Sequence, residues 1–422
     1  MLFPRRHGRL GASAALAALV VVLSGCNDAP RPLESVDARS TVEAPSARSA
    51  PGALVLPPVP QAPPPGEPTA ERAPAPAAEP TPEPSLPRPE AEPEAPQIGS
   101  AQAARAAAAP AAPAGDVAQG YPFGPASVWR ADISAAPNAH NSAALVAHLA
   151  RSVHDKYSGI AAFNAYQYNN SYYVAPPGTP RVDVGFNDCQ GNGHVPDGLL
   201  GPGGHFTQVP IPNGAVPSPG TDKALSVYSP ETDQLWEFWV TAQSGGAWSA
   251  CWGGRIDDVS SSPGFFNGSF GATATGLAST GGMVRLADIR SGSIEHAMSL
   301  AITNPRVFTE LSWPAQRSDG FDHHPDAVPE GTRLRLDPSI DVRSLGLHPV
   351  AQMIALAAQK YGFIVVDKAG AVAVIAESGA PEEAATGQDP WAEILGDTPD
   401  WQVMEGFPWD ALQALPRDYG RP

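Results

Sequence analysis

The sequence predicts a mainly β fold, an antiparallel β-sandwich or jelly roll with two or three helices, which makes it α+β overall. One observation is a series of short extended runs between residues 205 and 256, rich in β-branched and aromatic residues and separated by turn residues. A second is the alternation of side-chain character in 292–302 and 331–336. A third is helical spacing of apolar residues in 142–159 and 348–362.

Composition divides the chain into a linker and a folded part. The 49 prolines and 41 glycines are too many for one compact fold, and the prolines are concentrated in the first quarter. Residues 26–119 consist mainly of Pro, Ala, Glu and Ser, which bury too little apolar surface to fold, so they predict a disordered tether. Residues 120–422 hold most of the aromatic residues and predict a single globular, β-rich domain.

The first 25 residues have the features of an export signal. Arg5 and Arg6 precede an apolar segment, 10–23, that is too short to span a membrane comfortably. Leu23-Ser24-Gly25-Cys26 resembles the lipobox of bacterial lipoproteins. The resemblance implies removal of residues 1–25, lipidation of Cys26 and attachment to a membrane in the cell envelope. Asn27 stands where an inner-membrane retention signal has Asp, which favours the outer membrane if the cell has one.

The two other cysteines bear on a disulfide, and the net charge bears on the kinds of partner that the protein can bind. In an oxidising compartment, Cys189 and Cys251 predict a disulfide, with two unconnected buried thiols as the alternative. The formal net charge of −17 argues against nucleic acid as a partner and disfavours polyanionic glycans.

The elements of the first half suggest both structural and binding roles. A helix is expected from Ser142, followed by a strand in 163–174. The loop 176–204 carries Asp and Asn side chains that suit calcium, although a loop of turn residues explains the same composition. KALSVYS and DQLWEFWVT, at 223–229 and 233–241, are expected to form a hairpin.

Aromatic residues surround one acid in these strands. Glu237 lies between Trp236 and Phe238, which point to the opposite face of the strand, and it is a candidate catalytic carboxylate. Trp248 and Trp252 are expected on one strand face, where two indoles could form a platform for sugar rings. The alternative is that these tryptophans belong to the core.

The segment 292–302 adds an acid–base pair of candidates. Glu295 and His296 are adjacent, and alternation places His296 on the apolar face of the predicted strand. A buried histidine with a carboxylate partner can act as a general base, whereas a lone one is more often a hydrogen-bonded core residue. Asp257 and Asp319 complete the carboxylates considered for glycoside cleavage.

The segment 317–326, RSDGFDHHPD, has the densest set of charged and imidazole side chains. Asp319, Asp322, His323 and Asp326 could together bind Zn²⁺ or Ca²⁺, and a solvated loop is the alternative. Arg317, and Arg333 on the next strand, are candidates for binding a carboxylate or another ligand group.

The last clear elements are a helix and a predicted hairpin. The helix has His348 at its cap and Pro349 at its first position, and 363–376 is expected to fold as a hairpin. The patterns G-x-I-x-H-A at 292–297 and E-G-x-R-x-R-L-D-P at 330–338 are similar to those of secreted bacterial proteins without assigned activity. This resemblance implies no mechanism and no catalytic residues.

Together these features predict a lipid-anchored envelope protein whose domain binds, and in one version cleaves, a glycan. The alternatives are a non-enzymatic adhesion lipoprotein that binds a protein partner, and a metal-dependent hydrolase that uses the Asp/His loop.

Overall fold

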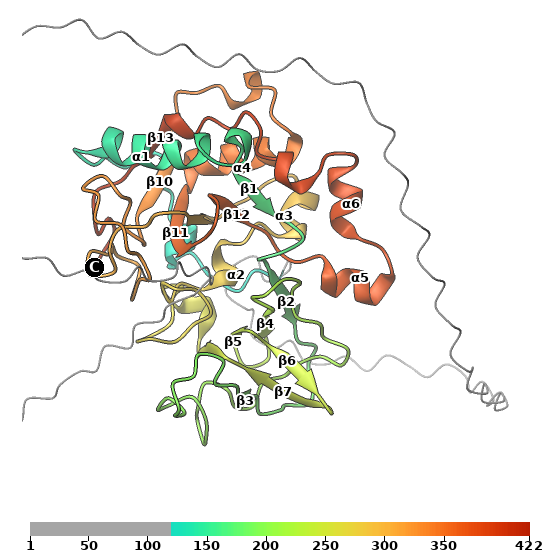
Figure 1. Ribbon diagram of the computed structural model, residues 1–422. Helices are drawn as coiled ribbons and strands as arrows, with labels where there is room; N and C mark the ends of the chain where they lie inside the picture. Colours follow the sequence, from blue (N-terminus) through green and yellow to red (C-terminus); the bar gives the residue numbers. More distant parts are fainter. Residues whose placement is uncertain (1–119) are drawn as a thin grey trace, which may run out of the picture. The chain divides into compact units, whose positions relative to one another are not determined.

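The structure, a computed structural model, describes residues 120–422 (Figure 1). The predicted signal peptide, Cys26 and the predicted tether lie outside the described residues. Residues 120–422 form a mixed α/β fold with thirteen strands in three sheets and six α-helices. No helix in this range combines the length and the apolar character needed to cross a membrane. The prediction of strands mixed with helices is confirmed, and helices are more numerous than expected.

The largest sheet has six strands in the order β1-β12-β9-β11-β10-β13. Their bounds are β1 Ala162–Asn164, β9 Met298–Ile302, β10 Arg333–Leu336, β11 Phe363–Lys368, β12 Ala373–Ile375 and β13 Leu412–Ala414. All five residues of β9 are buried, as expected for a central strand with neighbours on both edges.

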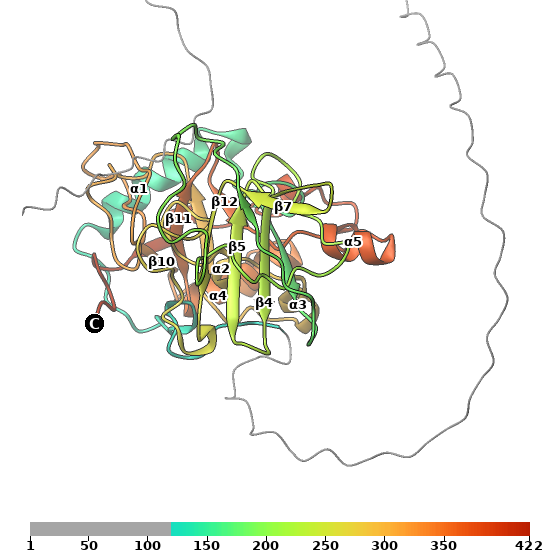
Figure 2. The ribbon, with the colours of Figure 1, turned by 90° about the horizontal axis from the view of Figure 1, so that it is seen from below.

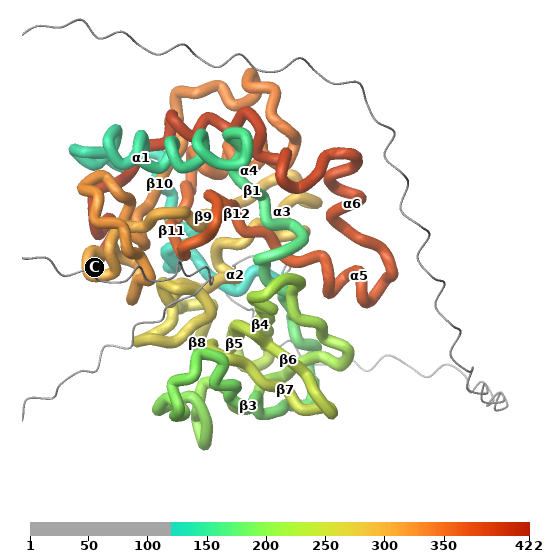
Figure 3. The backbone as a smooth tube through the Cα atoms, viewed as in Figure 1, coloured from blue at the N-terminus to red at the C-terminus, as the bar shows by residue number. Residues whose placement is uncertain are grey.

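The predicted hairpin across 363–376 is wrong. Strand β9 lies between β11 and β12 (Figure 3), pairing with β11 in parallel and with β12 in antiparallel orientation. The sequence of 363–376 shows two apolar runs joined by a turn, but it contains nothing about a distant strand that can insert between them.

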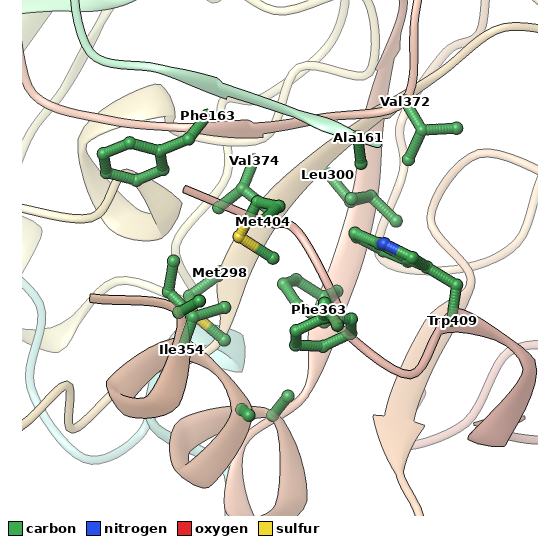
Figure 4. Close-up of a cluster of buried hydrophobic side chains, with 14 of the residues drawn as sticks. Ala161, Phe163, Met298, Leu300, Ile354, Phe363, Val372, Val374, Met404 and Trp409 are labelled. Atoms are coloured by element: carbon green, nitrogen blue, oxygen red, sulfur yellow. The ribbon is translucent and has the colours of Figure 1, made fainter. Parts of the chain in front are cut away.

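One face of this sheet is covered by helices α1 (Ser142–His154), α4 (Pro349–Lys360) and α6 (Pro390–Leu395), which share one hydrophobic cluster with it. Leu300 and Phe363 of the sheet and Ile354 of α4 all belong to this cluster (Figure 4). Burial of such side chains contributes about 1.5–3 kcal/mol each.

The two long helices begin where the sequence predicts. Helix α1 starts at Ser142, but it ends at His154 because a 3₁₀ turn with left-handed Ser158 follows. At the start of α4 the His348 side chain accepts a hydrogen bond from the Val350 N–H. Pro349 occupies the first turn, where its missing N–H costs nothing.

The other two sheets are smaller. The four-stranded sheet has the order β2-β4-β5-β8, and the three-stranded sheet the order β3-β7-β6. Their bounds are β2 Asn170–Val174, β3 Gly185–Phe186, β4 Ala224–Ser229, β5 Gln234–Trp239, β6 Ala242–Ser244, β7 Ala247–Ala250 and β8 Trp252–Ile256. The expected hairpin is confirmed as the antiparallel pair β4–β5, which Figure 2 shows side by side.

Strand β5 separates two hydrophobic clusters. Leu235 belongs to a cluster that also contains Ile364 of the six-stranded sheet. Trp236 and Phe238 point the other way, into a cluster with Trp248 of β7. The alternation predicted for this strand is therefore confirmed, and the first cluster connects the two larger sheets.

Short helices and a disulfide complete the fold. Helix α2 (Ser279–Gly282) stands near the junction of the two larger sheets, and α3 (Leu286–Ser291) and α5 (Ala380–Thr386) lie to the right of it in Figure 1. A disulfide joins Cys189 to Cys251, as predicted, and links the loop after β3 to the turn between β7 and β8.

Candidate functional site

Two small hollows adjoin each other at Arg285, and we call them together the Arg285 site. The larger has a volume of about 190 Å³ and is named the Glu377 hollow. It is lined by Tyr172, Val174, Arg285, Leu286, Ala287, Arg290, Glu377 and Glu382. The smaller, the Glu295 hollow, has a volume of about 100 Å³. It is lined by Arg130, Arg285, Asp288, Ser291, Ser293, Glu295 and His296.

The Glu377 hollow forms where distant segments meet. Tyr172 comes from β2, Arg285 and Arg290 from the start and end of α3, and Glu382 from the first turn of α5. Glu377 follows β12 directly. Figure 1 shows β2, α3 and α5 on the same side of the fold.

Arg285 is buried and held in one orientation. Its Nη2 donates to Asp288 Oδ1 at 2.5 Å and its Nε to Asp288 Oδ2 at 3.2 Å. The Arg285 backbone N–H also donates to Asp288 Oδ2 at 2.9 Å, so the Asp288 carboxylate closes the first turn of α3. The guanidinium carbon lies 4.7 Å from the centre of the Tyr121 ring. This arginine is therefore fixed before any ligand arrives.

His296 supports Asp288 and is not free to act as a base. Its Nε2 lies 3.1 Å from Asp288 Oδ2 and its Nδ1 lies 2.8 Å from the Ala297 carbonyl oxygen. Both ring nitrogens are therefore engaged by groups of the protein. Burial alone would raise the pKa of Asp288, but the charges and hydrogen bonds of His296 and Arg285 hold it below its usual value.

Glu377 is positioned by its backbone and one of its oxygens. Its N–H donates to the Val284 carbonyl at 2.8 Å, and its carbonyl accepts from the Trp391 indole at 2.8 Å. Its Oε2 accepts from the Leu286 N–H at 3.0 Å. Burial raises the pKa of Glu377 to about 7, although the Leu286 N–H and the Arg285 charge oppose the rise.

Glu382 has the opposite environment. Arg290 binds it through two hydrogen bonds, of 2.8 Å from Nη1 and 2.6 Å from Nη2. These bonds hold the pKa of Glu382 below its usual value. The Glu377 hollow thus contains one carboxyl group that is partly protonated at neutral pH and one that is ionised.

The Glu295 hollow contains two charges without ionic partners. Within residues 120–422, neither Arg130 nor Glu295 forms a salt bridge. The Ser291 and Ser293 side chains lie beside them. The hollow therefore offers hydrogen-bond donors and acceptors of both charge signs to a ligand.

The four predicted catalytic residues do not converge. Glu295 and His296 line the Glu295 hollow, whereas Glu237 and Asp319 line neither hollow. The buried Glu237 carboxylate accepts from the backbone N–H groups of Ser279 at 2.9 Å and Thr280 at 2.8 Å. Its role is to cap α2.

Asp319 and the two predicted binding arginines have other partners. Asp319 Oδ2 lies 3.5 Å from Lys368 Nζ. The Arg317 side chain donates hydrogen bonds to backbone carbonyls of 269–274, including that of Ala274 at 2.9 Å. Arg333, buried in β10, donates to the Val128 carbonyl. Neither arginine lines the Arg285 site.

The predicted tryptophan platform is wrong. Trp248 lies in β7 and Trp252 in β8, which belong to different sheets because the chain changes strand at Cys251. Trp248 is a core residue. Trp252 stacks on Phe270 with ring centroids 5.8 Å apart.

The predicted metal ligands also separate. Asp322 Oδ2 lies 3.3 Å from Nε2 of His148 on α1, and His323 is exposed. Asp319 pairs with Lys368, and the Asp326 backbone N–H donates to the His324 ring. In the part of the chain that the structure describes, no three His, Cys, Asp or Glu residues are placed to hold a metal ion, and this includes the predicted calcium ligands of 176–204.

Sequence reasoning missed Tyr172, Arg285, Arg290, Glu377 and Glu382. A local signal exists only for Arg285, which stands three residues before Asp288 at a helix start. Comparisons with known proteins add no candidate: no family model matches the chain, and no curated protein and no solved structure matches it.

Proposed function

We propose that the chain is a lipid-anchored envelope protein that binds a neutral glycan at the Arg285 site. The observation that carries the proposal is the pair of hollows that share a fixed arginine, Arg285, in their lining. An arginine whose orientation is set in advance adds little ordering cost when a ligand fills the hollows that it lines.

The charge of the site suits an uncharged, hydroxyl-rich ligand. Arginines and acids together line the two hollows: Arg130, Arg285 and Arg290 with Asp288, Glu295, Glu377 and Glu382. Sugar hydroxyls both donate and accept hydrogen bonds, so they can use groups of both signs. The net charge of −17 remains unfavourable for a polyanionic glycan.

Size and shape favour a short stretch of an oligosaccharide. The hollows, of about 190 and 100 Å³, are smaller than the roughly 300–1,000 Å³ of sites for drug-sized ligands, so each suits one ring or its substituents. Tyr172 supplies an aromatic surface in the Glu377 hollow, and its hydroxyl is anchored to the Gly120 carbonyl at 2.6 Å. We include in the proposal a sandwich-like packing of the two larger sheets, because Leu235 and Ile364 share a cluster.

The test is binding of the full chain to an array of neutral and charged oligosaccharides, followed by calorimetry with the best ligand. We expect binding to neutral glycans, and a loss of about tenfold in affinity for Arg130→Ala and for Glu295→Gln, since each removes charge-assisted hydrogen bonds. Both residues line the Glu295 hollow, and neither has a salt bridge in the range 120–422 that the change would break.

Arg343→Ala and Glu405→Gln are matched controls, because both residues are exposed and line neither hollow. They should bind as the unaltered chain does. Binding that is absent for every glycan, or equally weakened by the control pair, would contradict the proposal.

A further inference from the structure

Two carboxyl groups share the Glu377 hollow with an aromatic ring and a fixed arginine. Glu377 enters from the end of β12 and Glu382 from α5, and both line the hollow beside Tyr172. This goes beyond binding, because a ligand that fills the hollow touches two acids held in different surroundings.

We propose that Glu377 is the general acid and Glu382 the general base of a glycoside hydrolase centre. This inference rests on the proposed function, since it needs the same glycan in the same hollow. A pair of carboxyl groups in contrasting environments is the arrangement by which glycosidases divide the roles of acid and base.

The backbone around Glu377 fixes the proton donor. Residues 376 and 377 bridge to Val284 on one side and Asn170 on the other, so segments from three parts of the chain hold this position. Glu377 Oε2 is occupied by the Leu286 N–H. Its other oxygen takes no hydrogen bond from residues 120–422, so it can carry the proton toward the hollow.

The environment of Glu382 suits a general base. Each of its two oxygens accepts one hydrogen bond from Arg290, which keeps the carboxylate ionised and oriented. A carboxylate oxygen has a second lone pair that can accept a proton from water.

The reaction is a hydrolysis in which all atoms are accounted for. The Glu377 carboxyl gives its proton to the glycosidic oxygen as the bond from that oxygen to the anomeric carbon breaks. A water molecule adds its oxygen to the anomeric carbon and gives a proton to Glu382. Proton transfer from Glu382 to Glu377 through solvent restores both groups, and two sugar chains leave.

The pH dependence has a definite sign. Glu377 must be protonated, and since burial raises its pKa to about 7, the rate should fall as the pH rises above that value. Glu382 must be ionised, so activity should fall again only in acid, below the lowered pKa of that group.

The experiment incubates the full chain with cello-, xylo-, manno- and chitohexaose and with purified peptidoglycan, and measures new reducing ends by chromatography. We expect hydrolysis, with kcat reduced by about 100-fold or more in Glu377→Gln and in Glu382→Gln. Calorimetry should show that Glu377→Gln still binds the glycan within a few-fold, because glutamine keeps the oxygen that accepts from Leu286. The loss of rate above pH 7 should disappear in that variant.

Glu405→Gln is the matched control and should retain full activity. Glycan binding without any new reducing ends would overturn the hydrolase while leaving the proposed binding function intact. Full activity of Glu377→Gln would also overturn the hydrolase proposal, and so would a pH profile of this variant that matches that of the unaltered chain. Absence of both binding and cleavage would remove the two proposals together.

Discussion

At the level of single residues, the most unusual charges are three acids near the end of β11. Asp319, Glu330 and Asp367 lie close enough that the Asp319 N–H donates to Glu330 at 3.2 Å and the charge of Asp319 acts on both other acids. Burial raises the pKa of Asp367 to about 8 and holds the pKa of Glu330 well above its usual value. Within residues 120–422, Asp319 Oδ1 and Glu330 Oε1 are buried without a hydrogen bond. A proton on Glu330 supplies the donor that these oxygens need.

The first prediction at this scale concerns stability and pH. A carboxyl group whose pKa is raised by folding binds more protons in the folded state, so stability falls as pH rises from about 4 toward 8. Replacing Asp367 with Asn removes that penalty. We therefore expect the free energy of unfolding of the variant, relative to that of the unaltered chain, to be about 2 kcal/mol higher at pH 8 than at pH 5.

Urea unfolding at both pH values measures this difference. Asp155→Asn, at an exposed position, is the control and should show no such change. If the free energies of unfolding of Asp367→Asn and the unaltered chain differ by the same amount at both pH values, the prediction is wrong. The other charged groups near this cluster are Asp222, Arg317 and Lys368.

At the level of elements, short helices depend on groups supplied by other segments. Helix α2 has four residues and no cap from its own sequence. The N–H groups of Ser279 and Thr280, which have no acceptor within the helix, donate instead to the Glu237 carboxylate of β5. Glu237, which the sequence presents as a catalytic acid, therefore joins β5 of the four-stranded sheet to helix α2.

The prediction for this contact is a loss of stability. Glu237→Gln places an amide N–H₂ where one backbone N–H needs an acceptor, so the free energy of unfolding should fall by about 1–3 kcal/mol. Chemical denaturation measures the change, and Glu405→Gln on the surface should unfold as the unaltered chain does. An unaffected midpoint for Glu237→Gln would show that the cap contributes nothing.

At the level of the whole molecule, the proposed location depends on the N-terminus. A lipid on Cys26 followed by a Pro-rich tether would present a domain of high negative charge away from the membrane surface, where neutral glycans are better ligands than polyanions.

The prediction is that Cys26 is acylated. Metabolic labelling with a radioactive fatty acid should label the chain, and Cys26→Ser should abolish the label and release the protein from the membrane fraction. Cys189→Ser should remain labelled, since this residue forms the disulfide. An unlabelled chain, or a labelled Cys26→Ser variant, would contradict the lipoprotein proposal.

The sequence by itself determined the features that depend on neighbouring residues. Helical spacing after Ser142, the His348-Pro349 cap and the β4–β5 hairpin are encoded within a few residues, so each could be predicted. The disulfide was predictable from the number of cysteines. Alternation also placed Trp236 and Phe238 on one face of β5, because the period of a strand is local.

Only the tertiary structure decided which of these elements meet. The insertion of β9 between β11 and β12 turns a predicted hairpin into two strands of a larger sheet. The same packing brings Tyr172, Arg285 and Glu377 together from positions far apart in the chain, while it separates Glu237 from Glu295. Periodicity and capping act over one or two turns of chain, whereas a site depends on strand order and on which buried faces pack together, and no local pattern encodes either.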